Sequence, residues 1–319
     1  MAVCDTDAKA VQLLKERYPV QKHYLDMDDM LKSENLDIVD ITTPGFMHYA
    51  QASQAIERRV NVLIEKPLAL SSEEAYDLNT RSKKNAVQVC VVQNYRFRDA
   101  SIQLEKLRST GKIGRISSIN TYQHGGTLFG QPRWMWDERV SGGILYENAV
   151  HAVDFNTWLV GPHKRILACS SCYDDSLGLT TSIQALVEHE SNATSFLDLR
   201  WFASSIFYKS DIFASVSDVV VKFQPDSLVL QAGELGPLTD TISDIRRVYT
   251  FGKSLLMNRF ARDSIEPHLR IISGFVDSVK AGGSGPVTIE DVMPTMRLLD
   301  AIKNASRAST SRRATSGKP

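Results

Sequence analysis

Lys66 is the side chain whose place in the sequence is best suited to acid–base chemistry. It lies in Glu65-Lys66-Pro67, directly after the apolar run Val60–Ile64, which has the length and composition of a buried strand. A lysine at a strand end, in a cleft partly shielded from water, can exchange a proton with a substrate hydroxyl. Pro67 fixes the direction in which the chain leaves the strand. We therefore expect Lys66 to be an acid or base.

A second candidate, His151, follows the chain break Gly142-Gly143. Glu147 and His151 are four residues apart, which places them on one face of a helix, and Asp154 falls on the same side one turn later. A carboxylate beside an imidazole orients the ring and raises its basicity. A single helical histidine is more often a core residue. Here the paired glycines precede a glutamate, a histidine and an aspartate on one helical face, which favours a role in catalysis or binding.

Asp5 ends the short apolar run Ala2–Cys4. If this run is the second strand of a dinucleotide-binding fold, the carboxylate accepts hydrogen bonds from the ribose 2′-hydroxyl and repels a 2′-phosphate. That favours NAD over NADP. The alternative, of equal weight on these residues alone, is an acid that caps the next helix.

Two further strand ends carry polar groups. Thr42-Thr43-Pro44, with His48 after it, predicts a loop along which a pyrophosphate or a nicotinamide ribose could pass, although an ordinary turn explains it equally simply. Asn94, Tyr95 and Arg96 follow the run Val87–Val92 and offer several hydrogen-bonding groups to the sugar side of a cleft. A purely structural strand end is the alternative.

The elements that must position these residues change character along the chain. Residues 1–97 alternate short apolar runs with amphipathic helices, which predicts a Rossmann-like parallel sheet. Residues 98–304 hold many successive strand-like runs with few helices, which predicts an α+β domain with a large, mostly antiparallel, open sheet. Its last helix, Ile289–Asn304, is expected to pack back on the first domain, and the polar segment 305–319 is expected to be disordered.

Composition narrows the function classes. Apolar residues make up 43% and charged residues 23%, and 37 basic side chains balance 37 acidic ones, so no basic excess indicates a nucleic-acid partner. Cys169 and Cys172 form a C-x-x-C, but no second pair or nearby histidine completes a metal site. We expect two strand cysteines in a reducing compartment, no metal, no membrane span and a cytoplasmic location.

Taken together, these residues resemble the glucose–fructose oxidoreductase, inositol 2-dehydrogenase and rhizopine-catabolism family, called Gfo/Idh/MocA. No single motif is diagnostic, but their order and separation are. The segments that carry the resemblance are Asp5, Thr43-Pro44 with His48, Glu65-Lys66-Pro67, Asn94-Tyr95-Arg96-Phe97, Gly111-Lys112-Ile113-Gly114, Arg133-Trp134, Gly142-Gly143, His151, His268, Phe275 and Val287-Thr288-Ile289-Glu290-Asp291.

The resemblance implies a Rossmann domain followed by an α/β domain whose open sheet forms the interface of a homodimer or homotetramer. It also implies that Lys66 and His151 handle the hydroxyl proton of the substrate while hydride passes between the substrate carbon and the nicotinamide. Two positions depart from the family pattern: Glu147 stands where an Asp is usual, and Ala149 where a Gly is usual. The longer Glu147 keeps the charge but changes its reach.

Members of this family begin with a strand and a G-x-G-x-x-G turn that holds the pyrophosphate at a helix N-terminus. Residue Met1 falls on what would be the second strand, so about thirty residues of that fingerprint are missing ahead of it. In the strand order 3-2-1-4-5-6 the missing strand is central. We expect that the full protein starts earlier; the alternative is a fragment with impaired cofactor binding.

The sequence thus predicts an NAD(P)-dependent oxidoreductase that transfers hydride between nicotinamide, preferably of NAD, and a sugar, polyol or related cyclic alcohol. The alternatives are NAD-dependent glycoside cleavage on the same fold and a non-catalytic regulatory or binding homologue. The residues expected to act are Lys66, His151 and Glu147 in catalysis, Asp5, Thr43, Pro44, His48, Glu65, Lys66 and Asn94 around the cofactor, and Tyr95, Arg96, Arg133, Trp134 and His151 around the substrate.

Overall fold

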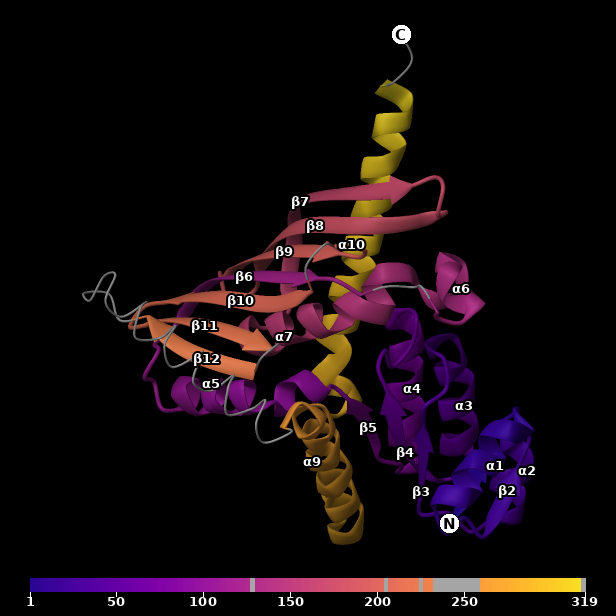
Figure 1. The fold of residues 1–319 in the computed structure, drawn as a ribbon. Helices are drawn as coiled ribbons and strands as arrows, with labels where there is room; N and C mark the ends of the chain where they lie inside the picture. Colours follow the sequence, from indigo (N-terminus) through magenta and orange to yellow (C-terminus); the bar gives the residue numbers. More distant parts are fainter. Residues whose placement is uncertain (127–129, 204–205, 224–225, 232–258, 317–319) are drawn as a thin grey trace.

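The computed structural model describes residues 1–126, 130–203, 206–223, 226–231 and 259–316, the last of these by backbone alone at 259–264 and 309–316. Its N-terminal part consists of parallel strands joined by helices, and its larger part is one sheet flanked by helices (Figure 1). The expected fold class, a Rossmann-like part followed by an α+β part with a large open sheet, is confirmed.

The N-terminal part contains two separate parallel sheets. One pairs β1 with β2, and the other has the order β3-β4-β5. The elements in chain order are β1 (Ala2–Cys4), α1 (Ala8–Arg17), β2 (Lys22–Tyr24), α2 (Met27–Ser33), β3 (Ile38–Ile41), α3 (Gly45–Glu57), β4 (Asn61–Glu65), α4 (Ser72–Asn85) and β5 (Val89–Val92).

Side-chain caps explain where three of these helices begin. Asp7, Asp26 and Ser71 each accept a hydrogen bond from a backbone N–H in the first turn of α1, α2 and α4. Such a cap satisfies one of the four N–H groups that a helix start leaves without an intrahelical partner. The strands between them are short and apolar, and Val62, Ile64 and Val91 are fully buried.

The two parallel sheets leave two open strand edges. Among the described residues, β1 pairs only with β2 and β3 pairs only with β4. Backbone N–H and C=O groups at such edges lack ladder partners.

The second part begins with the 3₁₀ turn η1 (Asn94–Phe97) and α5 (Asp99–Ser109), and continues into a seven-stranded sheet. The order is β12-β11-β10-β6-β9-β8-β7. All neighbouring pairs are antiparallel except β6 and β9, which are parallel. The strands are β6 (Ile116–His124), β7 (His163–Asp174), β8 (Leu179–His189), β9 (Thr194–Arg200), β10 (Phe207–Ala214), β11 (Asp218–Phe223) and β12 (Asp226–Gln231).

A short helical region connects β6 to β7. It comprises η2 (Arg133–Trp136), α6 (Glu138–Ser141), the π-turn η3 (Leu145–Ala149) and α7 (Val150–Val160). Nine of the eleven residues of α7 are buried, because the helix packs between the sheet and α10. α7 is therefore held rigidly, and with it the histidine in its first turn.

Two long helices end the described chain, α9 (Arg259–Ala281) and α10 (Ile289–Ser316). α10 contacts α4, α7 and β7, so it connects the N-terminal part to the large sheet (Figure 1). Its course corrects the expectation of a disordered tail: the helix continues from residue 305 to Ser316, and the Ser306 carbonyl accepts a hydrogen bond of 3.4 Å from the Ser171 hydroxyl. Residues 317–319 lie outside the described residues.

The two cysteines of the C-x-x-C both lie on strand β7. Cys169 pairs with Ala185 and Cys172 with Ser182 in an unbroken stretch of register, so side chains three positions apart point to opposite faces of the sheet. The two sulfur atoms therefore do not face each other. In the part of the chain that the structure describes, no helix is both long and apolar enough to cross a membrane.

Candidate active site

Lys66 extends from the carboxyl end of β4 to the turn that precedes α7. Its Nζ donates a hydrogen bond of 2.9 Å to the backbone carbonyl of Glu147. The Lys66–Pro67 peptide bond is cis. The amine of Lys66 thereby reaches from the parallel sheet to the helical region of the second part.

His151 occupies the first turn of α7, near the same amine. Its Nδ1 is buried without a hydrogen-bond partner among the described residues, and its backbone carbonyl accepts from the Tyr208 hydroxyl at 3.2 Å. Burial, followed by the positive charge of Lys66, holds the pKa of His151 well below its usual range. The ring is therefore neutral near pH 7, and able to accept a proton.

Glu147 lies in the π-turn η3 rather than in regular α-helix. A π-turn is wider than an α-turn, so residues four apart no longer lie directly above each other, and the expected Glu147–His151 pairing on one face does not follow. Among the described residues no hydrogen bond joins the two side chains, and Glu147 Oε1 is buried without a partner. Burial raises the pKa of Glu147, and the charge of Lys66 opposes that rise.

Replacing Glu147 by glutamine is expected to stabilise the protein near neutral pH and to slow turnover about tenfold or more. A carboxyl whose pKa is raised by folding weakens the fold as pH rises from its ordinary value of 4.5 through the folded value, so the benefit of Glu147→Gln grows with pH. Thermal unfolding at pH 4 and pH 7.5 measures it. The exposed Glu190→Gln is the control; a pH-independent shift equal in both variants contradicts the assignment.

Arg96 does not face the shared centre, which corrects its assignment to the substrate. Its Nε and Nη2 donate to the two oxygens of Asp154 at 2.8 and 2.7 Å, and Nη2 also reaches the Asp291 carbonyl. Asp154 in turn accepts from the Thr295 hydroxyl at 2.9 Å. The two side chains of the pair are 9% and 2% exposed, so this ion pair ties η1 to α7 and α10 inside the protein.

The Arg96–Asp154 pair is expected to be a strong structural contact. Arg96→Met leaves the buried carboxylate of Asp154 without its cation, which costs about 3–5 kcal/mol of unfolding free energy. Arg139→Met removes a matched ion pair with Asp137 whose arginine side chain is 89% exposed, and is expected to cost less than about 1 kcal/mol. Urea unfolding followed by circular dichroism compares the two. Equal losses would show that burial does not set the strength of the Arg96 pair.

The ring of Tyr95 packs against the imidazole ring of His151. The ring centroids are 4.4 Å apart, and the other contacts of Tyr95 are with Tyr208 and Phe223, each at 5.0 Å. The Arg98 guanidinium lies 4.6 Å from the centroid of Tyr95. Burial raises the pKa of the Tyr95 hydroxyl. Tyr95 is therefore at the centre that the sequence indicated, but as a support for the histidine ring.

His48 holds two loops of the expected cofactor side together. It is fully buried, with Nδ1 2.6 Å from the Pro67 carbonyl and Nε2 2.7 Å from the Thr43 carbonyl. A Cβ on Gly45, the first residue of α3, would lie 3.1 Å from the ring of Pro67, so a larger residue there would push the two segments slightly apart. His48 thus positions Thr43, Pro44 and Lys66 instead of contacting a ligand itself.

Trp134 covers the start of α3. Its ring meets Phe46 edge to face at 5.7 Å, next to Pro44 and Gly45, so η2 reaches the expected cofactor loop. Arg133 is exposed beside it. Thr43 donates from its hydroxyl to Gln51 at 2.5 Å.

Asp5 is exposed at the end of β1, and its Oδ1 accepts from the backbone N–H of Asp7 at 2.8 Å. The capping alternative for Asp5 is wrong, because the cap of α1 is Asp7; the turn at Asp5 uses one carboxylate oxygen and leaves the other available to a ribose.

Three groups at the centre escaped the sequence reasoning. Gln93 and Gln123 are 3% and 7% exposed, and Oε1 of each is buried without a partner, as is Oδ1 of Asn94. His268 of α9 lies 3.2 Å from Asn94 and 3.8 Å from Glu65. Only His268 gave a signal, as part of the resemblance, without a role. Buried acceptors without partners are rare in native proteins, and these suit a ligand rich in N–H and O–H donors.

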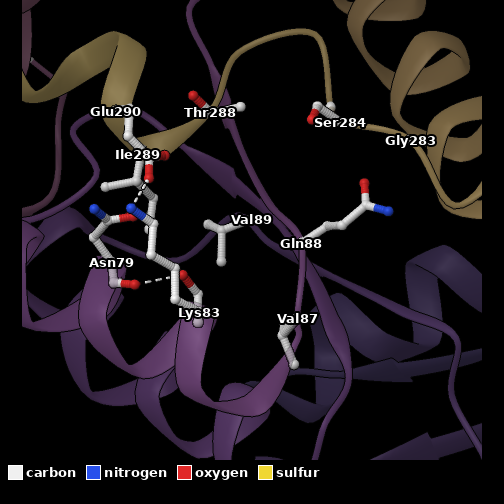
Figure 2. A pocket seen from close by; sticks show the side chains of 12 residues that line it. Asn79, Lys83, Val87, Gln88, Val89, Gly283, Ser284, Thr288, Ile289 and Glu290 are labelled. Carbon is white, nitrogen blue, oxygen red and sulfur yellow. Dashed lines mark hydrogen bonds and ion pairs between the residues drawn. The ribbon is translucent and has the colours of Figure 1, made fainter.

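These residues fit the nicotinamide end of a dinucleotide. The unpartnered oxygens of Gln93 and Asn94 follow β5, Lys66 follows β4, and ligands of open parallel sheets bind at these carboxyl ends. Figure 2 shows a different hollow of about 150 Å³ between α4, the start of β5 and the segment 283–290. The ion pair of Lys83 with Glu290, 2.6 Å, lies at its edge. This hollow is at the opposite end of β5 and is not the candidate site.

Two family models match the chain. Residues 1–93 match the family described as "Oxidoreductase family, NAD-binding Rossmann fold", and residues 102–209 match the "GFO/IDH/MocA C-terminal domain". The expected resemblance is therefore confirmed over both parts of the protein.

Among curated relatives, a D-apiose dehydrogenase of Paraburkholderia graminis is 26% identical over 203 residues, which are 62% of this chain and 52% of the relative. A scyllo-inositol 2-dehydrogenase (NADP(+)) of Bacillus subtilis is 27% identical over 158 residues, 49% of this chain and 43% of the relative. The chain thus spans about half the length of the curated relatives it matches.

A solved structure of the WlbA dehydrogenase of Bordetella pertussis, in complex with NADH and UDP-GlcNAcA, superimposes with a TM-score of 0.81 at 18% identity. The superposition covers 97% of this chain and 88% of that one, and it supports the fold. The two matched domain models, in the same order as the two parts of the structure, show that the chain belongs to the Gfo/Idh/MocA oxidoreductase family.

Proposed function

We propose that the protein is an NAD-dependent dehydrogenase or reductase of a sugar, polyol or related cyclic alcohol. The observation that carries the proposal is the meeting of the Lys66 amine with the helix turn of His151, at the carboxyl end of β4 and among unpartnered acceptors. The relatives named for D-apiose and scyllo-inositol act on polyhydroxylated substrates, which supports this substrate class.

Oxidation of an alcohol removes a proton from its oxygen and a hydride from its carbon. The nicotinamide, when bound, accepts the hydride at C4. Lys66 is the acid or base for the hydroxyl proton, and the neutral His151 holds the same oxygen through its unpartnered Nδ1. Glu147, whose carboxyl is partly buried near Lys66, places an acidic group beside the amine and orients it. Gln93 and Gln123 supply acceptors for the remaining hydroxyl groups.

The preference for NAD over NADP rests on Asp5. Its exposed carboxylate at the end of β1 is suited to accept from a ribose 2′-hydroxyl and would repel a 2′-phosphate. The Bacillus subtilis relative is named for NADP, so the two dinucleotides must be compared directly.

As a partner we propose a second copy of the chain, bound to the open face of the large sheet. That face carries Leu186 and Phe213, whose surfaces are 37% and 38% exposed.

The test is a panel of alcohols assayed with each dinucleotide. Purified protein is mixed with NAD or NADP and D-apiose, scyllo-inositol, D-glucose or a methyl glucoside, and absorbance of reduced nicotinamide is followed. Substrate-dependent reduction of NAD supports the proposal. Release of a free sugar without net reduction identifies glycoside cleavage instead. No reaction, together with no heat of NAD binding in calorimetry, identifies a non-catalytic homologue.

A further inference from the structure

Helix α9 brings His268 to the carboxyl ends of β4 and β5. α9 contacts both strands and η1, and it lies beside β5 in Figure 1. Two residues after His268, the Arg270 guanidinium donates to the Phe97 carbonyl at 2.8 Å and pairs with Asp99 at 2.8 Å. The docking of α9 on η1 therefore has its own anchor, and His268 is not needed for it.

The contact between His268 and Asn94 has a defined direction. Nδ2 of Asn94 carries two hydrogens and no lone pair to offer, so at 3.2 Å it donates and His268 Nε2 accepts. An imidazole nitrogen accepts only when it is unprotonated, so the ring is neutral with its proton on Nδ1. Glu65 Oε1 lies 3.8 Å from the same nitrogen, beyond hydrogen-bond distance.

This direction decides what Asn94 presents to a ligand. With Nδ2 engaged by His268, the other branch of the amide, Oδ1, is buried and has no partner among the described residues. It is an acceptor that requires an N–H or O–H donor. We infer that His268 is a positioning residue that holds the Asn94 amide in one orientation, so that its carbonyl accepts from the carboxamide NH₂ of a bound nicotinamide.

The inference rests on the proposed function for its ligand but not for its geometry. Were His268 a purely structural contact of α9, its removal would lower stability without changing which cofactor atoms are recognised. Were it a positioning residue, its removal frees the Asn94 amide to turn, and recognition of the carboxamide is lost while the rest of the dinucleotide is bound as before. Recognition of that one group therefore separates the two roles.

The experiment compares NAD with 3-acetylpyridine adenine dinucleotide, in which a methyl group replaces the carboxamide NH₂. Wild-type protein is expected to bind NAD about tenfold more tightly, the value of one hydrogen bond. Asn94→Ala and His268→Ala are each expected to reduce this ratio to about one, and His268→Gln, whose amide oxygen can accept from Asn94, restores part of it. His163→Gln, on β7, is the control. An unchanged ratio in both alanine variants overturns the inference.

A second readout needs no cofactor. Nitrogen-15 spectra of histidine-labelled protein report the tautomer of each imidazole, with His268→Ala identifying the resonance. The wild type is expected to show His268 with Nε2 unprotonated and Nδ1 protonated, and Asn94→Ala is expected to give a mixture of tautomers. A protonated Nε2 in the wild type overturns the inference. Failure of any dinucleotide to bind contradicts the proposed function and removes the nicotinamide as the ligand of Asn94, while the tautomer spectra still decide whether His268 positions the Asn94 amide.

Discussion

Replacement of Lys66 by alanine is expected to lower kcat by about a thousandfold while NAD affinity changes little. A positioned acid or base contributes about 10²–10⁴-fold, and Lys66 is the cation in contact with the helix turn that carries His151. Its Nζ also donates to the Glu147 carbonyl, and loss of that single hydrogen bond costs only about 1 kcal/mol of unfolding free energy. Turnover, dinucleotide fluorescence titration and thermal unfolding are measured on the same preparation.

Two companion variants separate acid–base chemistry from charge. Lys66→Arg keeps a positive charge but cannot release its proton near neutral pH, so it is expected to stay at least about a hundredfold below the wild type. Lys83→Ala removes an exposed lysine, paired with Glu290 at the edge of the hollow in Figure 2, and is expected to turn over normally. Wild-type turnover in Lys66→Ala, or full activity in Lys66→Arg, would remove the proposed proton transfer from Lys66.

A βα unit carrying a G-x-G-x-x-G turn, fused ahead of Met1, is expected to tighten NAD binding about a hundredfold or more relative to residues 1–319. The turn places backbone N–H groups and a helix N-terminus against the pyrophosphate, and two charge-assisted hydrogen bonds of about 1.5–3 kcal/mol each account for this factor. The same strand would pair with the open edges of β1 and β3, so the temperature of unfolding is expected to rise as well. Calorimetry and thermal unfolding measure the two effects.

A matched fusion distinguishes the two contributions. The same βα unit with its first two turn glycines changed to valine still supplies the strand, so it is expected to raise the unfolding temperature. Its turn no longer admits the close approach of a phosphate, so NAD affinity is expected to stay near that of residues 1–319. Equal NAD affinity in residues 1–319 and in both fusions would show that the pyrophosphate is bound elsewhere.

Most of the local structure could be predicted from the sequence because it depends on local chemistry. Asp7 and Ser71 cap their helices through side-chain hydrogen bonds within the first turn, and β3 is the short apolar run Ile38–Ile41. The alternation of strands with helices before residue 97, and of strands with strands after it, predicted the fold class. The parallel pairing of β6 with β9 was not predictable, because strand neighbours so far apart in the chain leave no mark on either strand's pattern.

The roles of Arg96 and Glu147 show where the sequence is insufficient. Arg96 follows a strand end just as Asn94 does. Only the tertiary structure shows that its guanidinium group is buried and donates two hydrogen bonds to the Asp154 carboxylate. The spacing of Glu147 and His151 indicates one helical face, but Glu147 lies in a π-turn, where a separation of four residues no longer places two side chains on one face. Residue types and spacing do not predict which of several possible hydrogen-bond or ion-pair partners a polar side chain will contact.

By itself, the sequence determined most of the elements and the family, and it singled out Lys66 and His151 as candidates. Short-range preferences and the position of Lys66 after its strand are encoded within a few residues. The tertiary structure alone decided that the amine of Lys66 reaches the turn before His151 and that His268 reaches Asn94 from α9. It also decided that the His48 ring joins the segments of Thr43 and Pro67 by hydrogen bonds. These contacts join residues 81, 19 and 174 positions apart, and they form only when packing of the whole core brings those segments together.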